Sequence, residues 1–124
     1  MPATAAAKLP GGRLVTITLP VGAQQAAPPH PRSAGGKSSP GNVYAQSVRC
    51  LDIAEQALQE AGASLADVVR TRVMLTDIRQ WRQAAHAHAR RFAQVRPVTT
   101  FIEVPRFVDP EWLVEFELDA IVSD

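Results

Sequence analysis

Cysteine is nearly absent from this 124-residue sequence, and so are long hydrophobic runs. The single thiol, Cys50, excludes an internal disulfide and a cluster of thiolate metal ligands, and such scarcity fits a reducing compartment. We therefore expect Cys50 to be a buried, unreactive side chain. The apolar run from Leu14 to Val21 is far shorter than a membrane span, so the sequence predicts no signal peptide, no transmembrane helix and a cytoplasmic location.

An excess of charge of either sign is also absent. Thirteen Lys and Arg side chains oppose twelve Asp and Glu side chains, which leaves a formal net charge of +1. Such a chain has no long-range field that would attract nucleic acid or an anionic membrane, so we expect neither as a partner. The sequence also lacks a Gly-rich phosphate loop, a nucleophile elbow and a cluster of Cys and His. It therefore gives no support to nucleotide-dependent or zinc-dependent chemistry.

What the sequence does contain is enough apolar material for one ordinary core. Hydrophobic residues make up 46% of the chain, which predicts a single domain over residues 1–124. Asn42 caps an amphipathic helix that ends at Gly62, and Asp77 with Gln80 resembles a capping box before a second helix that ends near Ala93. Alternating or β-branched runs predict strands at residues 13–19, 69–75, 98–104 and 113–122.

This order of elements predicts an α+β fold in which two helices cover one face of a mixed β-sheet. The last two strands are joined by a short turn, so we expect them to be neighbours, with Val98, Thr100 and Ile102 facing the helices. The uncovered face of the sheet must then meet either water or another subunit.

Two segments do not read as regular elements. Residues 1–9 are rich in alanine, and we expect them to be frayed or loosely attached. Residues 20–41 are rich in Pro, Gly and Ser, which predicts a long loop. This loop is either disordered or passive on the surface, or it covers a substrate.

The last predicted strand separates apolar from acidic side chains. Glu115, Glu117 and Asp119 share one parity, and Arg70 and Arg72 share the polar parity of the strand at 69–75. If these strands are neighbours, cross-strand ion pairs explain Glu117 and Asp119 without catalysis. Glu115 lies nearest the end of its strand, where a carboxylate could act as a general base or hold a water molecule.

Three other polar residues are candidates for a site. His86 and His88 are two positions apart on a helix and point to different sides, so we predict no metal site. His88 lies on the packed stripe, either as a core histidine with one hydrogen-bond partner or as a catalytic group. Pro97 should force Arg96 into extended backbone, where Arg96 either holds a substrate carboxylate, is solvated or lies between subunits.

Several motifs together resemble the RidA/YjgF family. The main ones are Ala61 to Arg70, which reads AGASLADVVR, and Val114 to Ala120, which reads VEFELDA. They are supported by Gln46-Ser47, Thr76-Asp77-Ile78 and Arg96-Pro97. The resemblance covers residues 42–122 and, more weakly, the strand at 12–19. It implies a chorismate-mutase-like fold, a homotrimer whose centre is made by the sheets, and ligand clefts between subunits.

The activity that the resemblance implies is hydrolysis of reactive enamines and imines to keto acids and ammonia, without a metal or organic cofactor. In the best-known members an arginine grips the substrate carboxylate, and a glutamate on the last strand positions the attacking water. The glutamate matches Glu115, but the position of the arginine is occupied by Thr99. Losing such a charge-assisted contact would cost about 1.5 to 3 kcal/mol of binding free energy.

Other positions also depart from the family pattern. A Ser-Gly pair of the family falls on Thr18 and Leu19, and a small residue or cysteine falls on Phe101. The asparagine and tyrosine of the second helix fall on Ala85 and His88. Larger side chains and the missing cation together imply a larger, more apolar substrate than aminoacrylate.

The leading hypothesis is a divergent, trimeric, cofactor-independent enzyme that acts on an imine, enamine or related small carbonyl compound in specialised metabolism. Its predicted catalytic residues are Glu115 and His88, and its predicted substrate-binding residues are Arg96, Thr99, Phe101, Leu19 and Thr18. The alternative is a noncatalytic trimer that binds a small ligand or a partner protein. Ribonuclease activity gains little support from the balanced charge.

Overall fold

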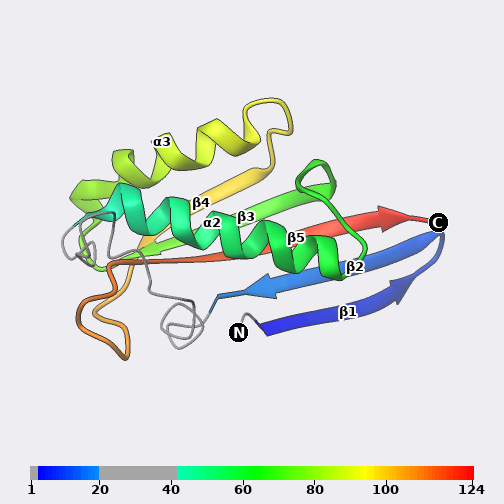
Figure 1. Cartoon of the computed structure of the whole chain (residues 1–124), viewed down its shortest axis with the longest axis horizontal. Coiled ribbons are helices and arrows are strands. Elements are labelled where there is room, and N and C mark those ends of the chain that lie inside the picture. The colour runs from blue at the N-terminus through cyan, green and yellow to red at the C-terminus, as the bar shows by residue number, and fades with distance from the viewer. Residues whose placement is uncertain (1–2, 20–41) are drawn as a thin grey trace.

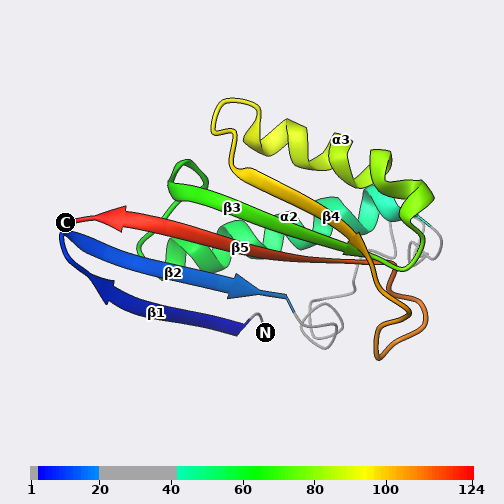
Figure 2. The same ribbon diagram turned by 180° about the vertical axis from the view of Figure 1, so that it is seen from behind.

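The computed structural model describes residues 3–19 and 42–124, so the predicted loop at 20–41 lies outside the described residues. Five strands form one sheet, and two α-helices lie on the same face of it (Figures 1 and 2). The strands are β1 (Ala3–Leu9), β2 (Gly12–Thr18), β3 (Val68–Leu75), β4 (Val98–Glu103) and β5 (Val114–Ser123). The helices are α2 (Val43–Glu60) and α3 (Trp81–Phe92), with short 3-10 turns η1 (Leu65–Asp67) and η2 (Ile78–Gln80).

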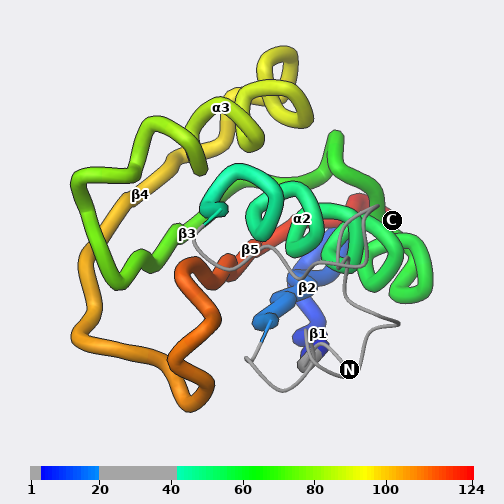
Figure 3. Tube along the Cα trace, turned by 60° about the vertical axis from the view of Figure 1, so that its left-hand side comes forward, coloured from blue at the N-terminus to red at the C-terminus, as the bar shows by residue number. Residues whose placement is uncertain are grey.

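The strand order is β1-β2-β5-β3-β4, which makes the sheet mixed as predicted. Only β3 and β4 are parallel, because α3 carries the chain back between them. The prediction that the last two strands are neighbours is wrong, since β3 lies between β4 and β5. Figure 3 shows β1 and β4 at opposite edges of the sheet, with α2 and α3 side by side.

The amino-terminal segment is a strand rather than the frayed end that the sequence predicted. Ala3–Leu9 pairs antiparallel with β2, and the pair Leu9↔Gly12 leaves Pro10 and Gly11 as a two-residue turn. Gly11 has φ 81, a left-handed conformation that glycine adopts without steric cost. Ala5, Ala6 and Ala7 of β1 are exposed, so backbone pairing holds the strand without the alternation that would have revealed it.

The core lies between β5 and the two helices. The predicted alternation of β5 is confirmed, because Val114, Phe116, Leu118 and Ala120 are buried while the acids between them are half-buried. The predicted cap is also confirmed, since the side chain of Asn42 accepts a hydrogen bond from the N–H of Ala45 at 2.9 Å. The helix α2 therefore begins where the sequence indicated and lies across the centre of the sheet.

Cys50 lies in this core, as expected. Its side chain is fully buried on α2, and burial raises the pKa of the thiol well above its ordinary value. The sequence predicts a packed stripe on this helix that consists of Tyr44, Val48, Leu51, Ala54 and Leu58. The last three are buried as predicted, but Tyr44 and Val48 are only partly covered, and Val43, Ser47 and Cys50 are buried in their place. The folded protein therefore keeps its thiol neutral and away from solvent.

The parity of β4 is the reverse of the predicted one. Val98 is 70% exposed and Ile102 is 45% exposed, whereas Thr99 and Phe101 are partly buried toward α3. The reason is the register with β3, which places Thr99 beside buried Thr71. At the start of β3, a register shift between Val68 and Arg70 leaves Val69 43% exposed, so the predicted inward position of Val69 is also wrong.

The backbone after α3 also differs from the prediction. Arg96 is not extended before Pro97 but has φ 57, the only positive φ at a non-glycine residue in the described structure. Its N–H donates to the carbonyl of Phe92 at 2.9 Å, which closes the end of the helix. Helix termination therefore decides the conformation of Arg96, and its side chain is exposed.

Candidate functional site

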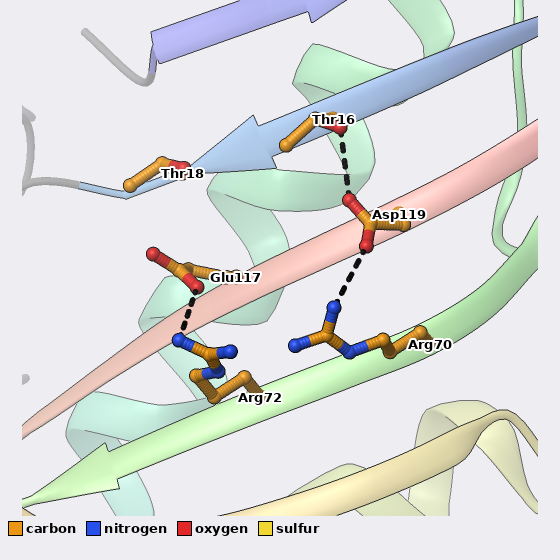
Figure 4. Close-up of a pocket in the computed structure, with 6 residues that line it drawn as sticks. All are labelled: Thr16, Thr18, Arg70, Arg72, Glu117 and Asp119. Atoms are coloured by element: carbon orange, nitrogen blue, oxygen red, sulfur yellow. Dashed lines mark hydrogen bonds and ion pairs between the residues drawn. The ribbon is translucent and has the colours of Figure 1, made fainter.

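The sheet face that α2 and α3 leave uncovered, called the open face below, carries two parallel rows of polar side chains (Figure 4). Each row crosses β2, β5 and β3 and contains a threonine, an acid and an arginine in register. The Asp119 row contains Thr16, Asp119 and Arg70, and the Glu117 row contains Thr18, Glu117 and Arg72. Together these six side chains line a pocket of about 220 Å³.

The predicted cross-strand ion pairs are present in both rows. Arg70 Nη1 lies 3.5 Å from Asp119 Oδ2, and Arg72 Nη1 lies 3.7 Å from Glu117 Oε1. Both arginine side chains are 44% exposed, so each pair contributes about 0 to 1 kcal/mol to the free energy of unfolding. The pairs balance the charge of the pocket more than they stabilise the fold.

Glu115 is the third acid of β5 and lies on the open face without an arginine opposite it. Its partner in the register is Met74. Burial, together with the negative charge of Glu117, raises the pKa of Glu115 to about 7. A carboxyl group with this pKa exchanges protons readily near neutral pH, which is the property of a general base.

His88 belongs to a buried polar cluster on the other side of the sheet. Its Nε2 lies 2.9 Å from the hydroxyl of Thr71, which donates to Thr99 Oγ1 at 2.9 Å; Thr99 in turn donates to the carbonyl of Pro97 at 3.1 Å. Because the hydroxyl proton of Thr71 is used on Thr99, His88 must donate its own Nε2–H to Thr71. This arrangement matches the predicted core histidine, and burial lowers the pKa of His88.

His88→Gln should make the protein less sensitive to acid. The pKa of His88 in the folded state lies below its ordinary value of 6.5, so the unfolded chain takes up the proton first. The stability that neutral His88 contributes at neutral pH is therefore lost as the pH falls from about 6.5 toward the lower pKa that His88 has in the folded state. Melting followed by circular dichroism at about pH 7.5 and about pH 5 should show a smaller loss of Tm in the variant.

The matched control is His86→Gln, because His86 is exposed on the same helix. This variant should lose as much Tm on acidification as the unchanged protein does. An equal loss in His88→Gln would contradict the assignment of a neutral, donating His88.

The structure does not bring all the predicted site residues together. Glu115 and Thr18 lie on the open face, whereas His88, Thr99 and Phe101 lie on the helix side. Phe101 makes an edge-to-face contact with Trp81, with ring centroids 5.5 Å apart. Within one copy of the chain, the sheet therefore stands between Glu115 and the helix-side group.

Two predicted substrate-binding residues are placed elsewhere. Leu19 is fully buried in the core rather than at a pocket wall, and its N–H donates to the carbonyl of Phe116 at 3.3 Å. Arg96 is exposed beyond the end of α3, in the left-handed conformation described above. Leu19 thus faces inward because β2 continues its alternation after Val15 and Ile17, which are also buried.

Sequence reasoning missed Thr16 as a pocket residue and gave Arg72 only a structural role. The signal for Thr16 was the alternation of Thr16 and Thr18 with Val15 and Ile17, which puts both threonines on the open face. What the sequence could not supply was the pairing of β2 with β5, which brings Thr16 to Asp119.

Within residues 3–19 and 42–124, no group of three His, Cys, Asp or Glu side chains is placed to hold a metal ion. None of the helices described is long and apolar enough to cross a membrane.

A mixed sheet with two helices on one face defines the YjgF or chorismate-mutase-like class of fold. The crystal structure of Rv2704 from Mycobacterium tuberculosis, a member of the YjgF/YER057c/UK114 family, matches with a TM-score of 0.70 and 37% identity over 94% of this chain and 84% of that one. The family model described as Endoribonuclease L-PSP matches residues 25–122. The chain belongs to this family, the RidA/YjgF family.

Two further relatives match over shorter regions. An uncharacterized protein of Streptomyces coelicolor, SCO2049, is 38% identical over 80 residues, which is 64% of this chain and 60% of that protein. The RutC family protein PYRAB12510 of Pyrococcus abyssi is 31% identical over 85 residues, which is 68% of this chain and 66% of that protein. The matched region thus spans less than two thirds of the length of either relative.

Proposed function

We propose that this protein is a divergent RidA-family enzyme that acts, without a cofactor, on an imine, an enamine or a related carbonyl compound of specialised metabolism. The observation that carries the proposal is Glu115, a carboxyl group whose pKa is raised to about 7 on an uncovered face of the sheet, next to a polar pocket along the same strand. A general base works best when its pKa is close to the working pH.

In this proposal the carboxylate of Glu115 takes a proton from a water molecule as the oxygen forms a bond to the imine carbon. The electron pair of the C=N bond moves to nitrogen, which takes up a proton. A second proton transfer to nitrogen makes it a leaving group. As the C–N bond breaks, the new hydroxyl group gives its proton to the carboxylate of Glu115, so that a carbonyl compound and ammonia leave. For an enamine, the same carboxyl group in its protonated form first protonates the carbon of the C=C bond that does not carry the nitrogen, and this converts the enamine to the imine.

The site requires more than one copy of the chain. Glu115 lies on the open face, whereas Thr99, Phe101 and His88 lie on the helix side near the edge strand β4. The β4 edge of one copy must therefore meet the open face of another for both groups to border one cleft. A homotrimer with clefts between its subunits, as the family resemblance implies, supplies this arrangement.

The substrate preference follows from the side chains at these positions. Thr99 stands where the best-known relatives have an arginine, and Phe101 stands where they have a small residue. We therefore propose that imines with larger side chains are better substrates than the smallest ones. His88 contributes by holding Thr71 and Thr99 in place, and Arg96 remains a candidate for contact with the substrate from its exposed position.

The proposal is tested with imines released from amino acids by an amino-acid oxidase and captured by semicarbazide. The protein should lower the captured fraction, with a larger effect for the imine of leucine than for that of alanine. Light scattering should give the mass of three chains. No effect on any imine would favour the noncatalytic alternative, efficient hydrolysis of aminoacrylate would contradict the divergent preference, and a monomer would contradict the shared cleft.

A further inference from the structure

Gln46, a buried residue of α2, joins this helix to the segment that leads into β5. Its side chain is 4% exposed. Gln46 Nε2 donates to the carbonyl of Glu111 at 2.9 Å, and Gln46 Oε1 accepts a hydrogen bond from the N–H of Leu113 at 2.8 Å. A primary amide carries a donor and an acceptor on one planar group, so a single side chain satisfies two backbone groups of the same segment. We call this pair of contacts the Gln46 bracket.

The bracket acts where the sheet itself holds the chain least. Glu111 and Leu113 lie before the first residue of β5, and the pairing of β2 with β5 ends at Thr18↔Glu117. Within the described residues, Glu115 therefore has a strand partner only on β3. The ends of strands open more easily than their centres, so this end of β5 depends on contacts from outside the sheet.

Leu113 is held at both of its backbone groups. Gln46 accepts from its N–H, and its carbonyl accepts a hydrogen bond from the N–H of Thr76 at 3.2 Å, just after the end of β3. Glu115 follows two residues later in the chain. A displacement of Leu113 is therefore passed along the backbone directly to Glu115.

We propose that Gln46 is a positioning residue for Glu115: the bracket fixes the start of β5 and thereby the place of the carboxyl group relative to the substrate. The inference rests on the proposed function, in which Glu115 is the general base. Such a base must lie within about 2.6 to 3.2 Å of the atom whose proton it takes. A misplacement of about 1 Å can lower a rate about 100-fold. In this role Gln46 acts through the backbone of β5 and does not touch the substrate.

Gln46→Met tests the bracket, because methionine has a similar length and makes neither hydrogen bond. For imine hydrolysis, kcat should fall at least tenfold while KM changes less than threefold, since the proposed substrate-binding residues Thr99 and Phe101 lie on β4. A loosened start of β5 also admits water to Glu115, which should lower the pKa of its carboxyl group from about 7 toward the ordinary 4.5. The acidic limb of kcat should then move to lower pH, although the charged neighbour Glu117 is unchanged. A residue that only stabilises the fold would lower Tm without moving this limb.

The matched control is Arg13→Met. Arg13 Nη2 donates to the carbonyl of Ala61 at 2.7 Å, so Arg13 also joins α2 to the sheet through a backbone group, but at the other end of the helix. This variant should lower Tm and leave kcat and its acidic limb unchanged. An equal shift of the limb in both variants would overturn the proposal, and so would an unchanged limb in Gln46→Met. If Gln46→Met does not fold, Gln46→Asn decides in the same way, because its amide is one methylene too short to reach both backbone groups.

A measurement without turnover separates this inference from the proposed function. The carboxyl carbon of Glu115 is titrated by NMR in ¹³C-labelled protein, with its signal assigned from Glu115→Gln. If the pKa of Glu115 falls in Gln46→Met but not in Arg13→Met while no imine is hydrolysed, the positioning role stands and the enzymatic activity does not. If imines are hydrolysed with a kcat that depends on Glu115, and Gln46→Met changes neither kcat nor this pKa, the activity stands and the positioning role is wrong.

Discussion

Glu115→Gln should lower kcat by about 100-fold or more, since a positioned general base contributes roughly 10²- to 10⁴-fold to such reactions. Glutamine keeps the size and hydrogen-bonding capacity of the side chain but cannot accept the proton of the attacking water. In the unchanged protein kcat should fall as the pH drops below about 7, the pKa to which burial and Glu117 raise Glu115. The residual activity of the variant should lack this acidic limb, as measured by initial rates across the pH range.

The same substitution should make the protein more stable above pH 7. The pKa of Glu115 is raised from 4.5 to about 7 in the folded state, so folding favours the protonated form. The stability that protonated Glu115 contributes is fully present below the unfolded-state pKa of 4.5. It is lost as the pH rises through about 7, where Glu115 in the folded protein becomes charged. Glutamine removes this loss, so Tm at alkaline pH should be higher in the variant. Loss of activity with a gain in stability is typical of a functional carboxylate.

Glu60→Gln is the control for this pair of measurements, because Glu60 is exposed at the end of α2, which lies beside the opposite end of β5 from Glu115: the adjacent Ala61 accepts a hydrogen bond from Arg13, the residue paired with Val122. It should leave both kcat and its pH dependence unchanged. Unchanged activity in Glu115→Gln, with trimers still formed, would favour a noncatalytic protein and remove Glu115 from the mechanism.

Gly12→Ala should lower the free energy of unfolding by about 3 kcal/mol, at the upper end of the range for overpacked sites. A Cβ atom at Gly12 would lie 2.2 Å from the carbonyl oxygen of Val122 and 3.3 Å from the Cα of Ser123. Both contacts are backbone atoms of β5, so no side chain can move aside, and β2 must separate from the central strand. Urea unfolding followed by circular dichroism measures the change.

Gly11→Ala provides the comparison, because nothing lies within 4 Å of a Cβ atom at Gly11. Its cost should come from the left-handed backbone alone, about 1 to 2 kcal/mol. If Gly12→Ala proved as stable as Gly11→Ala, the close approach of β2 and β5 at this end of the sheet would be wrong.

The parts of the fold that could be predicted are those fixed by neighbouring residues. The cap at Asn42 and the alternation of β5 depend on side chains a few positions apart, and both are confirmed. The position of β4 and the pairing of β1 depend on strands distant in the sequence. The reversed parity of Thr99 follows from the same cause, because the register with Thr71 is invisible in a single strand.

The candidate site was predictable to a similar degree. The acids of β5 and the arginines of β3 could be paired on the condition that their strands are neighbours, and the structure meets that condition. The condition says nothing about which of the two acids also accepts a hydrogen bond from a threonine. That difference comes from Thr16, which reaches Asp119 only because β2 lies on the other side of β5.

Cys50 gives the protein a built-in reporter of its own opening. It is the only thiol in the chain and is fully buried. A disulfide reagent added to the native protein can therefore react only when α2 lifts from the sheet or the whole domain unfolds. The rate at which the reagent labels Cys50, compared with that of a free thiol, gives the population of open molecules in plain buffer, without denaturant and without an introduced cysteine.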